Sequence, residues 1–262
     1  MGAREASTYI PGSGQAGGTL SWPRVGIVWH MRERAREARA APAMSDTPKP
    51  RREKPRLRGV SHLLAVFAAV PAVCWLAANA RSGPARTGAV IYGASLVALL
   101  GVSAVYHRVH WPSSIRHRIG RIDHSAIFLL IAGTYTPFCL LLGPGVGHAL
   151  LASVWGAAGL GVAVLVFWPL SKRLRSVLYV VLGWFIFPVL PALRLAIGDH
   201  ALALLFVGGF FYTVGAVVYA LRRPDPFPRV FGFHEIFHLL TIAAAACHFA
   251  VVDVAVRALG AR

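Results

Sequence analysis

The chain has few charged residues, and acidic ones are the scarcest. Only 14% of its 262 residues are charged, and 10 Asp and Glu stand against 27 Lys and Arg. Because 56% of the residues are hydrophobic, a soluble domain could not bury so much apolar surface, and an integral membrane protein is predicted. The net charge of +17 is concentrated in the N-terminal tail and in short gaps between apolar runs. This pattern is typical of membrane topology signals and argues against a nucleic-acid partner.

Cysteine and lysine are also scarce. The odd number of cysteines, all inside apolar runs, argues against a disulfide framework: Cys74, Cys139 and Cys247. A retinal protein would need a lysine inside a helix for its Schiff base. The only lysines lie outside the apolar runs, which excludes that class: Lys49, Lys54 and Lys172.

Residues 1–58 have no apolar periodicity and no signal-peptide pattern. They are predicted to form a disordered basic tail. The basic block at 49–56 is expected to face anionic lipid headgroups. Met44 opens a plausible alternative start, so residues 1–43 are interpreted as an over-extended reading frame.

Seven apolar runs follow, each close to the roughly 20 residues that a helix needs to cross a bilayer. The gaps after the second, fourth and sixth runs hold most of the positive charge, which places them and the N-terminus in the cytoplasm. The sequence therefore predicts an all-α membrane protein. Residues 59–257 would form a seven-transmembrane helix bundle with the N-terminus cytoplasmic and the C-terminus outside. The runs cover about 60–80, 88–107, 123–143, 147–168, 176–196, 201–221 and 234–256.

The last run opens with His234-Glu235-Ile236-Phe237-His238. Histidines four residues apart share one helix face, so both imidazoles can reach one metal ion. The string also matches a zinc metalloprotease motif in which the glutamate is the general base. We do not favour a protease, because Glu235 points away from the face shared by His234 and His238.

Three further residues are expected at the depth of this histidine pair. Ser103 and His107 lie where the second run ends, and Asp123 lies where the third begins, both on the predicted cytoplasmic side. Three imidazoles from His107, His234 and His238 would leave the fourth position of a tetrahedral zinc open. Asp123 could take up a proton or orient an imidazole, or could instead cap a helix. Ser103 could hydrogen-bond water, substrate or an oxyanion.

Other histidines are given lesser roles. His248 lies about 21 Å beyond His234 along the helix, too far to share a metal, and is predicted to be hydrogen-bonded inside the bundle. His124 is either a partner of Asp123 or a headgroup-facing residue. The rest receive no chemical role: His62, His110, His117, His148 and His200.

These motifs together resemble the progestin and adipoQ receptor superfamily, whose bacterial branch is called hemolysin III, or the TrhA-like membrane homeostasis proteins. The resemblance rests on four motifs: Ser103-x-x-x-His107, Arg121-Ile122-Asp123-His124-Ser125-Ala126-Ile127, Gly133-Thr134-Tyr135-Thr136-Pro137 and His234-x-x-x-His238. It covers about residues 58–256. It implies a Zn²⁺ ion held by His107, His234 and His238, with Asp123 and Ser103 beside it, in a bacterial inner membrane.

The resemblance also implies a likeness to alkaline-ceramidase-type hydrolases. We therefore expect a zinc-dependent hydrolase of lipid amides or esters that acts in membrane lipid homeostasis, with membrane lipids as partners. A receptor-like or membrane-sensing protein with structural zinc is the alternative. A cytolytic hemolysin is less favoured, because the chain has no amphipathic toxin segment.

Overall fold

The computed structural model describes residues 31–34, 36 and 55–262. Most of the proposed over-extended start, 1–43, and most of the predicted tail lie outside these residues. Residues 31–34 and 36 belong to a first unit, Met1–Arg52, and are helical. Glu53–Arg262 forms a separate compact unit, which is described by itself below.

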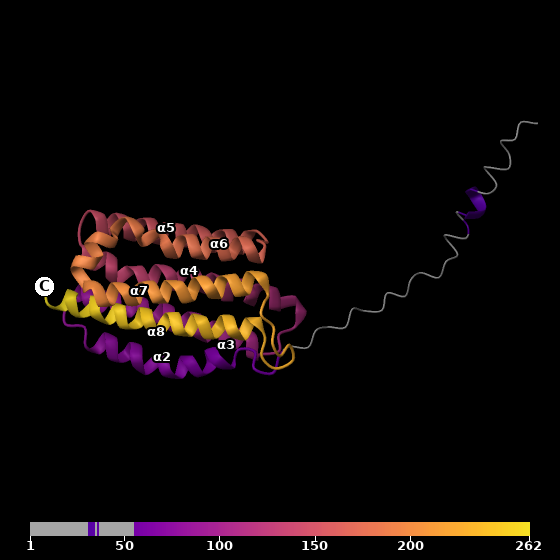
Figure 1. The fold of residues 1–262 in the computed structure, drawn as a ribbon, viewed down its shortest axis with the longest axis horizontal. Coiled ribbons are helices and arrows are strands. Elements are labelled where there is room, and N and C mark those ends of the chain that lie inside the picture. Colours follow the sequence, from indigo (N-terminus) through magenta and orange to yellow (C-terminus); the bar gives the residue numbers. More distant parts are fainter. Residues whose placement is uncertain (1–30, 35, 37–54) are drawn as a thin grey trace, which may run out of the picture. The chain divides into compact units, whose positions relative to one another are not determined.

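Long helices packed side by side build this second unit (Figure 1). The prediction of an all-α fold is confirmed for the residues that the structure describes. Six helical stretches are long and apolar enough to cross a membrane. The elements are α2 (Val60–Ala78), α3 (Gly83–Arg108), α4 (Ser113–Leu142), α5 (Val146–Phe167), α6 (Lys172–Gly183), the 3₁₀ helix η1 (Trp184–Val189), α7 (Leu190–Leu221) and α8 (Phe233–Gly260).

The fifth and sixth predicted runs belong to one 50-residue helical stretch, Lys172–Leu221. Gly198 interrupts it with non-helical backbone angles, φ 81° and ψ 169°, a conformation that glycine adopts readily. The two arms run antiparallel, because the Lys172 ammonium lies 5.3 Å from the centroid of the Tyr219 ring. Trp184 Nε1 likewise donates to Thr213 Oγ1 at 3.0 Å. Each predicted apolar run therefore lies in helical structure to within two residues at its ends.

The predicted start of the third run at 123 is wrong by ten residues. Helix α4 begins at Ser113, after Pro112 as its N-cap residue. The basic residues Arg116, Arg118 and Arg121 therefore lie within the helix and not in a gap. Hydropathy marked only the apolar part of α4, whereas the backbone continues as a helix through its polar first turns.

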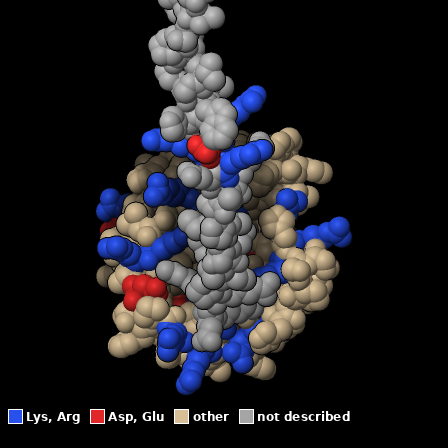
Figure 2. Space-filling model, turned by 90° about the vertical axis from the view of Figure 1, so that its right-hand side faces the viewer, with Lys and Arg blue, Asp and Glu red and all other residues tan. Residues whose placement is uncertain are grey.

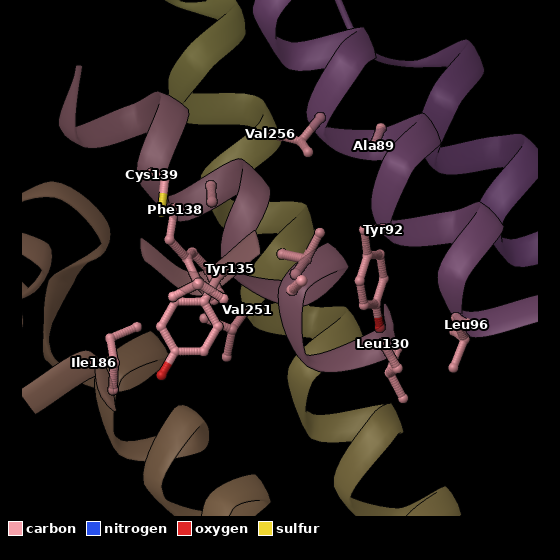
Figure 3. Close-up of a cluster of buried hydrophobic side chains, with 14 of the residues drawn as sticks. Ala89, Tyr92, Leu96, Leu130, Tyr135, Phe138, Cys139, Ile186, Val251 and Val256 are labelled. Atoms are coloured by element: carbon pink, nitrogen blue, oxygen red, sulfur yellow. The ribbon is translucent and has the colours of Figure 1, made fainter. Parts of the chain in front are cut away.

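A short 3₁₀ segment, η1, separates α6 from α7. Pro188 lies inside it and has no N–H to donate to the preceding turn. Tyr135 of α4 fastens the end of α6 just before this segment, since its hydroxyl donates to the carbonyl oxygens of Leu182 at 3.1 Å and Gly183 at 2.8 Å. Figure 3 shows this hydroxyl pointing toward the segment that carries Ile186.

The core lies where α3, α4 and α8 meet. Buried residues from these three helices face one another in Figure 3, among them Tyr92, Phe138 and Val251. Helices α3 and α4 approach so closely that a Cβ on Gly133 would lie 2.1 Å from Ser95 Oγ. Close packing through small residues is how helices associate in lipid. Cys74, Cys139 and Cys247 are free, as predicted.

Candidate metal centre

Three histidines from two helices converge at one end of the bundle. His107 comes from the last turn of α3, and His234 and His238 come from the first turns of α8. The Nε2 atoms of His107 and His234 are 3.1 Å apart. One nitrogen from each of the three residues lies within 4.8 Å of the others. The predicted cluster is thus assembled, although His107 is 127 residues from His234.

The start of α8 is fixed by Glu235. Its carboxylate accepts the N–H of Gly232, the N-cap residue, at 2.8 Å, and it pairs with Arg58 Nε at 2.6 Å. Asp225 accepts the N–H of Phe233 at 3.2 Å. Helix α8 thus begins where His234 and His238 both point into the bundle. Both contacts of the Glu235 carboxylate are thus to the helix start and to Arg58. These contacts argue against a role for Glu235 as a general base at the three histidines.

The chain just before α2 packs against the same end of the bundle. Arg56 N–H donates to the Arg229 carbonyl at 3.0 Å, and Leu57 N–H donates to the Val230 carbonyl at 3.2 Å. The sequence assigned residues 55–58 to the tail, yet they pack here. Gly59 follows with φ 78°, and a Cβ at this position would lie 2.6 Å from the Cβ of His107.

Asp123 and Ser103 lie beside the histidines. Asp123 is 8% exposed, and its Oδ2 is 3.9 Å from His107 Nε2 and 3.4 Å from His124 Nδ1. The buried Ser103 side chain is next to this carboxylate. Asp123 lies ten residues inside α4, so the helix-cap alternative is wrong. His124 takes the first of its two predicted roles, as a partner of Asp123.

The three histidines fit a metal ion. Tetrahedral zinc holds two imidazole nitrogens about 3.3 Å apart when each bond is about 2.05 Å, close to the 3.1 Å between His107 and His234. The Nδ1 of His238 is buried and has no hydrogen-bond partner in the described part of the chain. Neutral imidazoles are common ligands of zinc and other transition metals, so the cluster has the donors for such an ion.

His62 belongs to this end of the bundle and was not predicted. It lies in the first turn of α2 and is 2% exposed. Its ring stacks on that of His238, with centroids 3.9 Å apart and planes 8° from parallel. Neither ring nitrogen has a hydrogen-bond partner among the described residues. The available signal was its place at the predicted cytoplasmic end of the first run, which is the depth of His107.

A cavity of about 150 Å³ begins at these histidines and extends into the bundle. Its wall includes His234 and His238 at one end and His248 further along α8. The fourteen residues from His234 to His248 correspond to about 21 Å. Most of the remaining wall is apolar. As predicted, His248 lies apart from the cluster and forms a hydrogen bond, with its Nε2 3.3 Å from the Leu205 carbonyl oxygen.

The end of the bundle that holds the histidines is rich in basic side chains. Figure 2 looks onto the end where α3 and α7 finish and α4, α6 and α8 begin, and Lys and Arg surround it. The described basic residues near these helix ends include Arg108, Arg116, Lys172, Arg173, Arg222 and Arg229.

The fold and the site define a multi-pass helical membrane protein with a buried three-histidine cluster at one end of its bundle. The family model described as haemolysin-III related matches residues 51–249. The chain belongs to this family, and through its relatives to the progestin and adipoQ receptor superfamily.

Three relatives illustrate the breadth of that group. The chain is 34% identical to hemolysin-3 of Bacillus cereus over 196 residues, 72% of this chain and 86% of the relative. It is 31% identical to the human monocyte to macrophage differentiation factor, over 61% of this chain and 66% of the relative. It is also 30% identical to the adiponectin receptor protein of Drosophila melanogaster, over 62% of this chain and 40% of the relative.

Proposed function

We propose that the protein is a zinc-dependent hydrolase of lipid amides or esters, ceramidase-like, which acts on membrane lipids in membrane lipid homeostasis. In this proposal the bundle crosses a bacterial inner membrane seven times, with the N-terminus cytoplasmic and the C-terminus outside. The two arms on either side of Gly198 supply the fifth and sixth crossings. The basic end of the bundle then faces the cytoplasm, as the positive-inside rule requires.

One observation carries the proposal: a mostly apolar cavity ends at a histidine cluster that also holds a carboxylate and a hydroxyl. The cavity wall includes Ser103, Asp123, His234 and His238. An acyl chain would occupy the apolar part, and its amide or ester carbonyl would lie at the histidines. Ionisable residues within a membrane bundle are costly and mark functional sites.

The roles of the side chains follow from their positions. Zinc, when bound, polarises a carbonyl and activates water. The Asp123 carboxylate, 3.9 Å from His107 Nε2, is placed to take up a proton near the ligands and to return it to the leaving group. The Ser103 hydroxyl donates a hydrogen bond to the developing oxyanion. His124, 3.4 Å from Asp123 Oδ2, holds that carboxylate in place.

Release of fatty acid from ceramide by the full-length protein in nanodiscs tests the proposal. We expect Asp123→Asn to lower the rate by about 100-fold or more and His107→Ala to abolish it. Asp253→Asn is the control, because Asp253 pairs with Arg257 in the second half of α8, and it should leave the rate unchanged. Turnover that survives His107→Ala rejects the mechanism.

The alternative is a membrane-sensing protein in which zinc is structural. The close packing of His238 against His62 favours this second candidate, since structural sites are buried and rigid. Stoichiometric zinc without turnover of any lipid amide or ester, together with loss of thermal stability in His234→Ala, would select it.

A further inference from the structure

The cavity has a second polar end, away from the histidine cluster. His248 and Tyr212 line it there, and His248 follows His238 by ten residues, about 15 Å along α8. Apolar residues of α4 line the wall between the two ends, among them Ile127 and Leu130. A ligand that begins at the histidine cluster and follows the cavity would therefore meet a polar pair about 15 Å along its chain.

The polar pair offers one donor and one acceptor. His248 Nε2 is 3.3 Å from the Leu205 carbonyl oxygen. Because a carbonyl only accepts, Nε2 carries the hydrogen, and Nδ1 of the neutral imidazole is left as an acceptor. The Tyr212 ring lies 5.3 Å from the His248 ring at an angle of 67°. Among the described residues, neither Tyr212 Oη nor His248 Nδ1 takes part in a hydrogen bond, since the one bond of His248 uses Nε2.

The backbone of α7 beside His248 leaves room for the imidazole ring of that residue. A Cβ on Gly208 of α7 would lie 2.3 Å from Cδ2 of His248, so only glycine leaves room for the ring. A histidine near the middle of a membrane helix is costly and by default indicates a function. The Leu205 carbonyl accounts for one of its two nitrogens only.

We infer that this second end binds a hydroxyl group within the acyl chain of the lipid, about 15 Å from the histidine cluster. A hydroxyl both accepts from Tyr212 Oη and donates to His248 Nδ1, whereas a ketone uses Tyr212 alone. An unsubstituted chain leaves both groups unpaired. The inference deepens the proposed function, because it assigns lipids with a hydroxylated acyl chain as the preferred class for the same cavity.

Binding without turnover provides the test. Stearate, a positional series of monohydroxystearates and the matching oxostearates would displace a fluorescent fatty acid from the full-length protein in nanodiscs. We expect one short range of hydroxyl positions to bind about tenfold more tightly than stearate. Tyr212→Phe should abolish the preference for the ketone and weaken that for the hydroxyl, whereas His248→Phe should weaken the preference for the hydroxyl and leave that for the ketone unchanged.

Tyr92→Phe is the matched control. Tyr92 is buried, and its hydroxyl lies 3.5 Å from the Ala245 carbonyl oxygen, outside the cavity wall. A uniform affinity across the positional series, or equal losses in Tyr92→Phe and Tyr212→Phe, overturns the inference. The wild-type series decides the matter even if a variant fails to fold. Position-dependent binding without hydrolysis would refute the hydrolase and leave this inference standing.

Discussion

The imidazole of His62 lies flat against that of His238, with centroids 3.9 Å apart. These residues come from the first turns of α2 and α8, helices at opposite ends of the chain. The stack covers one face of His238 and limits the rotation of its ring. The ring nitrogen that a metal requires is therefore held in one orientation before any ion binds.

This relationship predicts a contrast between two substitutions of His62. His62→Phe keeps an aromatic ring in the stack and should retain both the metal and most of the stability. His62→Ala leaves a cavity beside His238 and should lower the free energy of unfolding by about 2 kcal/mol. Thermal unfolding with parallel metal analysis measures both effects. Equal losses of metal in the two variants would mean that the imidazole acts through its nitrogens.

Metal binding should be sensitive to substitution of Gly59, as it should be to substitution of the histidines beside it. Alanine there must adopt φ 78° and would place its Cβ 2.6 Å from the Cβ of His107. Gly59→Ala is expected to displace His107 and to weaken metal binding by about tenfold. Gly83→Ala, which meets nothing within 4 Å, is the control in a chelator competition assay. Unchanged metal affinity in Gly59→Ala would contradict the close approach seen here.

Two glycines of α5 should respond differently to the same substitution. A Cβ on Gly161 would lie 2.5 Å from the Phe128 ring, whereas one on Gly159 meets nothing within 4 Å. Gly161→Ala is expected to destabilise the protein by about 1–3 kcal/mol through overpacking. Gly159→Ala should be neutral or slightly stabilising. Comparison of their melting temperatures in one detergent tests the helix contact, and similar values would argue against it.

Glu235 is predicted to matter for stability and not for chemistry. Glu235→Gln weakens a partly buried pair with Arg58, which should cost about 1–2 kcal/mol, while zinc content and lipid turnover stay near those of the wild type. Asp199→Asn is the matched control, because its pair with Arg194 is exposed, and it should change the melting temperature little. Loss of turnover in Glu235→Gln with zinc retained would restore the protease-like role for this glutamate.

Hydropathy and loop charge were enough to predict the helices. A long apolar run that crosses a membrane must satisfy its own backbone hydrogen bonds, and a helix is the structure that does so within one segment. They were not enough to predict where α4 begins, since Ser113–Ile122 is polar yet helical. The break at Gly198 falls in the gap that hydropathy predicts between the fifth and sixth runs, at 197–200, although the helical stretch continues on both sides of it.

The histidine cluster could be predicted because spacing and charge placed its members at one depth. His107, His234 and His238 needed only the four-residue period and the order of the helices. His62 needed knowledge of which faces of α2 and α8 meet, which no local pattern supplies. The pair formed by Tyr212 and His248 depends in the same way on Gly208, whose missing side chain makes room for the imidazole.

Zinc content per chain tests the central claim most directly. Full-length protein purified without chelator should hold about one zinc per chain by mass spectrometry. His107→Ala should lose it, whereas His200→Ala, an exposed histidine of α7 outside the cluster, should keep it. Wild-type protein without metal, or His107→Ala with as much zinc as the wild type, would contradict the account.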